Sequence, residues 1–147
     1  MHRLTQSVLS LMLMAIFIGA CSAPQATLQP TPATNSSIAN PASENCIKLG
    51  GKVSIQQRGD GGQYGICLFE DNRQCEEWAL LRGECPAGGL KITGYVTLAA
   101  QYCAITGGEY TVTGNSNQEN ELGSCAFKNG KTCDAGDYFN GKCNPTN

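Results

Sequence analysis

Apolar and polar positions divide the chain into three stretches of different character. Residues 8–18, VLSLMLMAIFI, are apolar apart from one serine, and they follow Arg3. Residues 22–40 carry no charge and are rich in Ala, Pro, Ser and Thr. From residue 41 onward, short apolar groups alternate with glycine-containing polar segments, which is typical of short helices and strands. The pattern therefore predicts a targeting segment, a tether and a folded part.

The first stretch has the layout of an export signal. A positive charge at Arg3 is followed by eleven apolar or near-apolar residues and then by Gly19 and Ala20. A transmembrane helix needs about 20 apolar residues, so this segment is too short to anchor the chain. We expect residues 1–20 to be removed as a signal peptide and residues 21–39 to form a disordered tether.

Eight cysteines beyond the tether form two sets of four with nearly the same spacing. The intervals are 21, 8 and 10 residues in the first set and 22, 8 and 10 in the second. The sets are Cys46, Cys67, Cys75 and Cys85, then Cys103, Cys125, Cys133 and Cys143. Gly51, Gly65 and Gly83 recur in register as Gly108, Gly123 and Gly141. This indicates a duplication, with a first module at residues 40–86 and a second module at residues 94–147.

Local signals predict the early elements of the first module. Asn40 is a good N-cap and Pro41 suits the first helical position, so residues 40–51 predict a short helix that ends at a glycine pair. KVSIQQ at residues 52–57 and YGICLF at residues 64–69 predict strands joined by the turn RGDGG.

A second helix is predicted over residues 75–85, CEEWALLRGEC. Its two glutamates lie at the positive end of the helix dipole, and Gly83 would end it. In the second module, residues 97–108 predict a helix and residues 109–114 a strand. The last element, which has a glycine where the first module has its tryptophan, is expected to be a helix or a turn.

These elements predict a small α+β disulfide-rich fold of two tandem modules, each with a short helix, a β-hairpin and a second short helix or turn. About 50 residues bury too little apolar surface for stability alone, so disulfides are expected. Cysteines at the ends of a helix over residues 75–85 would be about 15 Å apart, beyond the roughly 7 Å that a disulfide spans. Two pairings stay open in the first module: Cys46–Cys75 with Cys67–Cys85, and Cys46–Cys85 with Cys67–Cys75. The set that we favour is Cys46–Cys75, Cys67–Cys85, Cys103–Cys133 and Cys125–Cys143.

Residues 18–21, Ile-Gly-Ala-Cys, resemble the lipobox of bacterial lipoprotein signals. The resemblance implies that cleavage falls before Cys21, that Cys21 receives a diacylglyceryl thioether, and that the new N-terminus is acylated. Several acyl chains hold a protein at a membrane durably. Ser22, by resemblance to Gram-negative lipoproteins, implies sorting to the outer membrane. Cys21 is then the ninth cysteine, left over from the two sets of four.

NPASENC at residues 40–46 and GGQYGICLFEDNRQCEEWALLRGEC at residues 61–85 resemble a family, the cysteine-rich domain of unknown function numbered 333. The label haemolysin is often attached to this family. The second module is similar to the family in its cysteines, its glycines and Phe127. The resemblance implies an exported or lipid-anchored envelope module and no particular activity.

The composition offers little for catalysis, metal binding or nucleic-acid binding. His2 is the only histidine and leaves with the signal, so we expect no Ser-His or Cys-His pair and no enzyme activity. Neither a close cysteine pair nor a calcium-loop pattern is present, so no metal or cofactor is expected. Without Arg3 the formal charge is −3, from nine basic and twelve acidic residues. No basic patch suits a nucleic acid.

Several residues with chemical potential have a simpler structural interpretation. Glu76 and Glu77 are expected to stabilise a helix N-terminus rather than to act as a catalytic pair. Trp78, the only tryptophan, is expected to fill the core of the first module, together with Phe69. Phe127 is expected to do the same in the second module.

Small stapled modules with exposed loops suit binding, so we expect a binding or inhibitory module of the cell envelope. Its ligand would be a protein or a glycan, and the membrane would be its partner through Cys21. The candidate loops are residues 57–63, with Arg58 and Asp60, and residues 70–74, with Asp71 and Arg73. The alternatives are a membrane-active, haemolysin-like component, which the lack of a cationic amphipathic segment disfavours, and a structural protein of the envelope.

Overall fold

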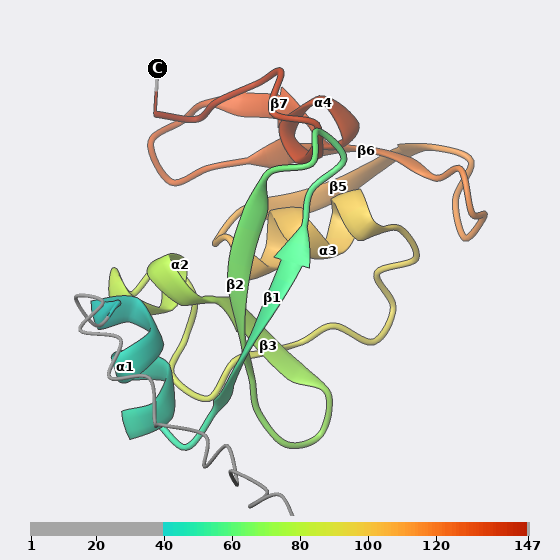
Figure 1. Cartoon of the computed structure of the whole chain (residues 1–147). Helices are drawn as coiled ribbons and strands as arrows, with labels where there is room; N and C mark the ends of the chain where they lie inside the picture. The colour runs from blue at the N-terminus through green and yellow to red at the C-terminus, as the bar shows by residue number, and fades with distance from the viewer. Residues whose placement is uncertain (1–39, 147) are drawn as a thin grey trace, which may run out of the picture. The chain divides into compact units, whose positions relative to one another are not determined.

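The chain folds into two small antiparallel sheets with short helices, and the computed structural model describes residues 40–146 (Figure 1). The elements of the first half are α1 (Pro41–Lys48), β1 (Lys52–Gln57), β2 (Gln63–Leu68), β3 (Arg73–Glu76), α2 (Glu77–Leu81) and β4 (Leu90–Lys91). Those of the second half are α3 (Leu98–Ile105), β5 (Glu109–Gly114), β6 (Leu122–Ala126), β7 (Thr132–Asp134) and α4 (Ala135–Phe139). The predicted α+β disulfide-rich fold in two similar halves is confirmed.

The first helix of each module begins at a side-chain cap. The Asn40 side chain accepts a hydrogen bond from the backbone N–H of Ala42 at 3.0 Å, with Pro41 in the first helical position. Thr97 accepts from the N–H of Ala100 at 3.1 Å at the start of α3. These bonds satisfy backbone donors that have no partner inside the helix, and the cap at Asn40 confirms the prediction made for it.

Strands β1, β2 and β5 follow the predicted segments, and β3, β4, β6 and β7 lie where no strand was predicted. The first sheet has the order β1-β2-β3-β4 and the second has β5-β6-β7. The linker between the modules contributes β4, which pairs with β3 through Gln74 and Leu90. The turn between β2 and β3 has φ of 57° at both Asp71 and Asn72, a conformation that Asp and Asn tolerate.

The helix predicted over residues 75–85 is wrong in its extent. Cys75 lies in β3, and α2 covers only Glu77–Leu81. The chain reverses at Gly83, whose φ is +71°, and the N–H of Glu84 bonds to the carbonyl of Ala79 at 2.9 Å. This helix-ending motif brings Cys85 back to within 5.9 Å of Cys75, measured between Cα atoms.

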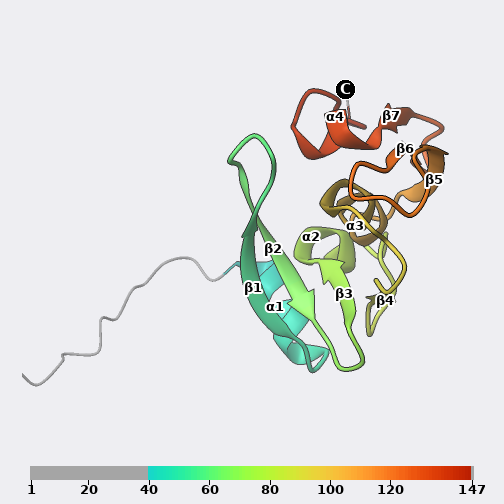
Figure 2. The ribbon, with the colours of Figure 1, turned by 90° about the vertical axis from the view of Figure 1, so that its right-hand side faces the viewer.

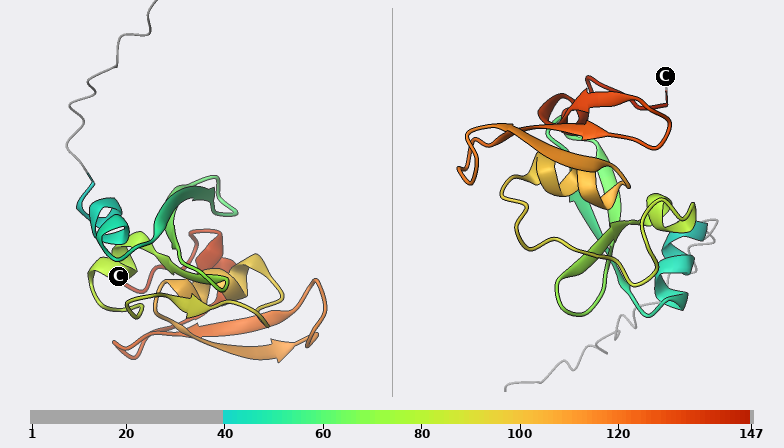
Figure 3. Two further views of the ribbon diagram at one scale, coloured as in Figure 1. Left: turned by 90° about the horizontal axis from the view of Figure 1, so that it is seen from below. Right: turned by 180° about the vertical axis from the view of Figure 1, so that it is seen from behind.

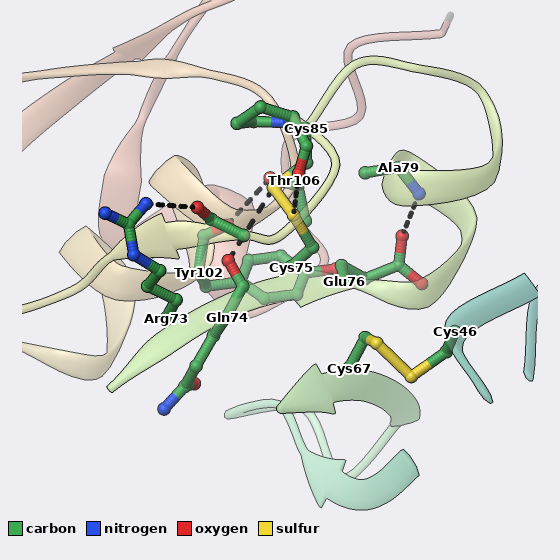
Figure 4. Close-up of a disulfide and its surroundings, with 12 residues drawn as sticks. Cys46, Cys67, Arg73, Gln74, Cys75, Glu76, Ala79, Cys85, Tyr102 and Thr106 are labelled. Atoms are coloured by element: carbon green, nitrogen blue, oxygen red, sulfur yellow. Dashed lines mark hydrogen bonds between the residues drawn. A yellow bond between two sulfur atoms is a disulfide. The ribbon is translucent and has the colours of Figure 1, made fainter. Parts of the chain in front are cut away.

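Both disulfide pairings that the sequence left open are therefore wrong, as is the set that we favoured. The disulfides are Cys46–Cys67, Cys75–Cys85, Cys103–Cys125 and Cys133–Cys143. In each module the first disulfide ties the first helix to the second strand. The second closes a loop of ten residues around the short helix, which the assumption of a continuous helix had excluded (Figure 4).

The glycines that follow the first helices make room for these disulfides. A Cβ on Gly51 would run into the sulfurs of Cys67 and Cys46. A Cβ on Gly108 would do the same with Cys125 and Cys103. These glycines recur in both modules because the backbone there lies too close to the disulfide sulfurs to leave room for a side chain.

Disulfide sulfur dominates the core of the first module, in place of the tryptophan that we expected there. Cys46, Cys67, Cys75 and Cys85 cluster with Ala79 and Leu80, and Phe69 packs against the edge of this cluster. Trp78 is 41% exposed, so its predicted role as core filler is wrong. Trp78 follows Glu77 on the outer side of a five-residue helix, which is too short to bury more than one face.

The two faces of the first sheet have different coverings. Side chains alternate along a strand, so Gly65 and Cys67 face the side of α1 and α2. Tyr64, Ile66 and Leu68 face the other way, and they pack against Ile92 and Ile105. Because Ile105 belongs to α3, the second module covers the outer face of the first sheet (Figures 1 and 3).

Helix α3 is accordingly buried on more than one side. Ala100, Cys103 and Ala104 are buried together with Tyr102 and Ile105. In α1, by contrast, only Ala42 and Cys46 are buried. A helix that is apolar around most of its circumference is expected to lie between two other layers. Figure 2 shows α3 in that position, between the first sheet and β5–β6.

Candidate functional site

The predicted binding loop between β1 and β2 is docked onto the second module. The backbone N–H of Gly59 donates to the carbonyl of Phe139 at 3.3 Å, and a Cβ on Gly141 would run into the carboxylate of Asp60. The tip of this hairpin lies next to α4 in Figures 1 and 2. The loop is therefore part of an internal contact and not a freely displayed turn.

The charged side chains of this loop hold one another. Arg58 Nη2 donates to Asp60 Oδ2 at 2.8 Å, and Asp60 Oδ1 accepts from the N–H of Gly62 at 2.9 Å. Arg58 Nε is buried and has no hydrogen-bond partner among residues 40–146. An unsatisfied buried donor of this kind is uncommon in folded proteins and calls for an explanation.

The second predicted loop lies at the opposite end of β2. Asp71 and Arg73 are exposed there, and Arg73 Nη1 donates to the carbonyl of Gly89 at 3.4 Å. A strand of six residues separates the two loops by roughly 20 Å. The structure therefore does not bring Arg58 and Asp60 together with Asp71 and Arg73 on one surface, as a shared binding site would require.

A cavity of about 740 Å³ lies at the seam between the modules, and we call it the seam cavity. Arg58, Arg82 and Glu84 line it from the first module. From the second module it is lined by Tyr102, Thr106, Gly107, Phe127, Lys128, Asn129, Tyr138, Gly141, Cys143, Asn144, Pro145 and Thr146. Of the predicted binding residues, Arg58 alone takes part in it.

Aromatic rings form one wall of the seam cavity. The ring centroids of Tyr102 and Tyr138 are 4.9 Å apart, and those of Tyr138 and Phe127 are 5.0 Å apart. Burial raises the pKa of Tyr102, and the nearby guanidinium of Arg58 opposes that rise. Burial also raises the pKa of Tyr138 to about 12, against a hydrogen bond with Thr106. Both hydroxyls are therefore neutral near pH 7 and serve as hydrogen-bond groups.

The Cys75–Cys85 disulfide lies next to two residues that line the seam cavity. Figure 4 shows Tyr102 and Thr106 of α3 beside the Cys75–Cys85 bridge of the first module. Gly107, which follows them, lies so close to Glu84 that a Cβ there would be 2.8 Å from the Glu84 Cβ. The cavity wall is thus cross-linked on one side and closely packed on the other.

Among residues 40–146, histidine and free thiols, two kinds of group common in acid–base and nucleophilic catalysis, are missing. This part of the chain has no histidine, and all eight of its cysteines are in disulfides. The seam cavity offers tyrosine and threonine hydroxyls, amides, and the charged groups of Arg58, Arg82, Lys128 and Glu84. These groups are suited to holding a ligand.

Comparison with known proteins assigns the chain to a family. The family described as Domain of unknown function (DUF333) matches residues 37–84 and again residues 96–142. The chain belongs to this family. It carries two DUF333 copies, which correspond to the first and second modules.

The curated relatives are uncharacterised. Two chains named Uncharacterized protein YdbJ, from Escherichia coli strain K12 and Escherichia coli O6:H1 strain CFT073, are each 31% identical over 75 residues. The match covers 85% of each relative and 48% of this chain. Each relative is therefore shorter than the stretch from residue 37 to residue 142 that the two DUF333 copies occupy here. No solved structure matches the chain.

The glutamates of the first DUF333 copy are structural, as predicted. Glu76 Oε2 accepts from the N–H of Ala79 at 2.7 Å and so caps α2, while burial raises the pKa of Glu76. Glu77 is 4% exposed and accepts from Asn40 Nδ2 at 2.8 Å and from Ser43 Oγ at 2.6 Å. The first glutamate thus begins α2, and the second ties α2 to the start of α1.

The second DUF333 copy fills the same space in another way. In the first copy, the Glu77 carboxylate lies over Gly65, where a Cβ would collide with it. In the second copy, the ring of Tyr110 from β5 lies over the equivalent Gly123. The position of Glu77 is there occupied by Ala135. The shared glycine therefore admits a large side chain from α2 in one copy and from the first strand in the other.

Three predictions fall on residues that the structure does not describe. Cys21 and the signal and tether segments, residues 1–39, lie outside the described range. Within residues 40–146, no helix is both long enough and apolar enough to cross a membrane.

Proposed function

We propose that this DUF333 protein is a non-catalytic binding protein of the cell envelope and that the seam cavity is its binding site. The observation that carries the proposal is the cavity itself, which has about 740 Å³ of volume and receives side chains from both modules. Small-molecule sites in proteins usually measure about 300–1,000 Å³ and combine aromatic walls with a few polar groups. The seam cavity has this size and this lining.

The cavity is also held in shape before any ligand arrives. Four disulfides brace the modules, and Tyr64 and Tyr102 pack together across the seam with ring centroids 4.9 Å apart. Ordering a flexible site on binding costs free energy, so a rigid site binds more tightly for the same contacts. This rigidity supports a binding role.

The absence of enzyme activity is part of the proposal. Phenol and alcohol groups line the seam cavity, but the pKa of Tyr102 and that of Tyr138 are both raised, so neither hydroxyl is a ready base near neutral pH. No histidine or free thiol occurs in residues 40–146 to activate them. The arrangement supports recognition without chemistry.

The envelope location is proposed from the sequence at residues 18–21. A lipid on Cys21 would hold the chain at the outer membrane, and the uncharged segment that follows would let the DUF333 copies stand away from the bilayer. Nineteen residues separate Cys21 from Pro41, where α1 begins. A ligand present in the envelope or its surroundings would reach the seam cavity from solution.

Affinity capture from the cognate envelope tests the proposal. The bait is the full chain with Cys21→Ser, in its oxidised form, and a reduced and alkylated copy is the first control. A second bait carries Asn129→Trp, which would fill part of the seam cavity from its rim. Asn120→Trp, on an exposed loop away from the cavity, is the matched control.

We expect a molecule that is retained by the oxidised bait and by Asn120→Trp, and lost with Asn129→Trp and with the reduced chain. Retention by Asn129→Trp at full strength would contradict the seam cavity as the site. An empty capture with every bait would contradict the binding role. A dye-release assay on lipid vesicles would then test whether the protein is membrane-active instead.

A further inference from the structure

We propose that the seam cavity takes a small organic anion, a carboxylate or a phosphate carried on a ring or another apolar body. This inference rests on the proposed function, because it assigns a ligand class to the cavity proposed above as the binding site. The charged lining residues are three cations and one carboxylate: Arg58, Arg82, Lys128 and Glu84. The whole chain has a formal net charge of −2, so an excess of cations here runs against its composition.

The cations differ in how far they are already neutralised. Arg82 is matched by Glu84, whose Oε2 accepts from both Nε and Nη2 at 3.0 and 2.8 Å. No ion pair within the described range includes Lys128, which is exposed at the cavity. Arg58 pairs with Asp60 through Nη2 and hydrogen-bonds the Tyr102 hydroxyl. An anion entering the cavity would thus meet the ammonium of Lys128, which has no ion pair among residues 40–146, beside the guanidinium of Arg58.

The guanidinium of Arg58, which lines the cavity, gives the strongest indication of ligand chemistry. Its Nη2 donates to Asp60, and the guanidinium also hydrogen-bonds the Tyr102 hydroxyl on the aromatic wall. The backbone of the loop holds Arg58 in place, because its N–H donates to the carbonyl of Gly62 at 2.8 Å. Carboxylate and phosphate oxygens are the acceptors that a guanidinium group binds best.

The remaining wall of the cavity calls for an apolar body on the same ligand. Along this wall the ring of Tyr138 lies between those of Tyr102 and Phe127, and Pro145 adds another apolar surface. A bare inorganic ion would fill only a small part of the volume of about 740 Å³. A molecule with a charged end for Arg58 and Lys128 and a ring for the aromatic wall would use both features.

The test compares benzoate with benzamide, which has nearly the same shape and no charge. Each is titrated into the oxidised full chain with Cys21→Ser, and binding is followed through the NMR signals of the Tyr102, Phe127 and Tyr138 rings. We expect benzoate to bind at least tenfold more tightly than benzamide and to weaken as salt is raised. Phenyl phosphate, titrated in the same way, tells a phosphate site from a carboxylate site.

Charge-removing variants locate the effect. We expect Lys128→Gln to weaken benzoate binding about tenfold, and Arg58→Gln to weaken it at least as much. Lys52→Gln removes the same charge from an exposed position on β1 outside the cavity lining, and it should leave the affinity unchanged. Because Arg58 also belongs to the docked loop, Lys128→Gln keeps the test decisive if Arg58→Gln fails to fold.

The outcomes separate this inference from the proposed function. Equal binding of benzoate and benzamide, with shifts at the same three rings, would overturn the anionic ligand class and keep the seam cavity as a binding site. Unchanged benzoate affinity in Lys128→Gln would also overturn it. If no probe shifts the rings, the anion inference fails, while loss of capture by Asn129→Trp would still uphold the proposed function.

Discussion

The ring of Tyr64 in β2 meets the ring of Tyr102 in α3 edge to face, with centroids 4.9 Å apart and planes at 70°. This contact joins two halves that the cysteine spacing divides into separate modules. It sits beside the Ile66, Ile92 and Ile105 cluster, so one apolar layer is shared by both DUF333 copies. The seam cavity depends on this layer, because Tyr102 is one of its lining residues.

Removing the Tyr102 ring should therefore weaken the whole fold. Tyr102 is 7% exposed, and truncating a buried aromatic side chain to alanine typically costs about 3 kcal/mol or more. We expect Tyr102→Ala to lower the free energy of unfolding by about 3 kcal/mol in a urea titration of the oxidised chain. Leu98→Ala, in the same helix at a position 62% exposed, should change it by less than about 0.5 kcal/mol. Equal effects of the two substitutions would contradict the shared layer.

Glu77 is expected to stabilise the fold through its hydrogen bonds to Asn40 and Ser43 at the start of α1. Glu77→Ala leaves the half-buried donors of Asn40 and Ser43 without their acceptor, so we expect a loss of about 2 kcal/mol. Val53 is the first-module counterpart of Tyr110. Adding Val53→Tyr to Glu77→Ala should recover part of the loss, because the new ring can fill the space over Gly65 as Tyr110 does over Gly123.

Thermal unfolding of the wild-type chain, both single variants and the double variant completes this cycle. Val53→Tyr alone should destabilise the chain, because Glu77 already occupies the space over Gly65. A double variant less stable than either single variant would show that the two modules do not use equivalent space.

Disulfide connectivity can be read directly by mass spectrometry of unreduced peptides. We expect Cys46–Cys67 and Cys75–Cys85 in the first module and the equivalent pairs in the second. Replacing Cys46 and Cys67 by alanine should cost about 0.6 kcal/mol more than replacing Cys75 and Cys85, because the first bridge spans 21 residues and the second spans 10. A peptide that links Cys46 to Cys75 would contradict this arrangement.

Tyr138 should make the fold sensitive to alkali. Its pKa is about 12 in the folded chain and 10.0 when unperturbed, so the unfolded chain loses this proton first as the pH rises. The stabilisation from Tyr138 is thus complete below pH 10 and is lost as the pH approaches 12. Urea titrations between these limits should show a steeper loss of stability in the wild-type chain than in Tyr138→Phe. Identical slopes would show that burial of this hydroxyl does not oppose its ionisation.

The proposed lipid anchor predicts where the chain is found after cell fractionation. Cys21→Ser removes the thiol that would carry the diacylglyceryl group, so we expect the variant to leave the membrane fraction for the soluble fraction. Ser22→Ala keeps the cysteine and should stay with membranes. Mass spectrometry of the processed chain would show the added acyl chains, and a soluble wild-type chain would contradict the anchor.

Much of the local structure was determined by short-range sequence signals. Asn40 and Pro41 start α1, and the strands β1 and β5 match the predicted segments at residues 52–57 and 109–114. The spacing of cysteines and glycines revealed the duplication. These features depend on neighbours within a few residues, so they can be derived from the order of the amino acids alone.

The disulfide pairing and the site were decided by tertiary structure. The chain reversal at Gly83 brings Cys85 to Cys75, although the local sequence pattern predicts one continuous helix with these residues at its ends. Docking of the β1–β2 loop on α4 turned the predicted free binding loop with Arg58 and Asp60 into part of a contact with the second module. An indication that the two modules pack together was present in the sequence, because Tyr64, Ile66 and Leu68 make one face of β2 apolar while α3 is apolar around most of its surface.

The composition of the seam cavity could be known only once the two modules were packed together. Arg58 and Arg82 lie in the first module, whereas Tyr102, Phe127 and Tyr138 lie in the second. Each of these residues has an ordinary interpretation within its own module, as a turn, helix-end or core residue. A sheet face and a helix that cannot be buried within one module pack against each other, and the cavity forms between the side chains around that contact.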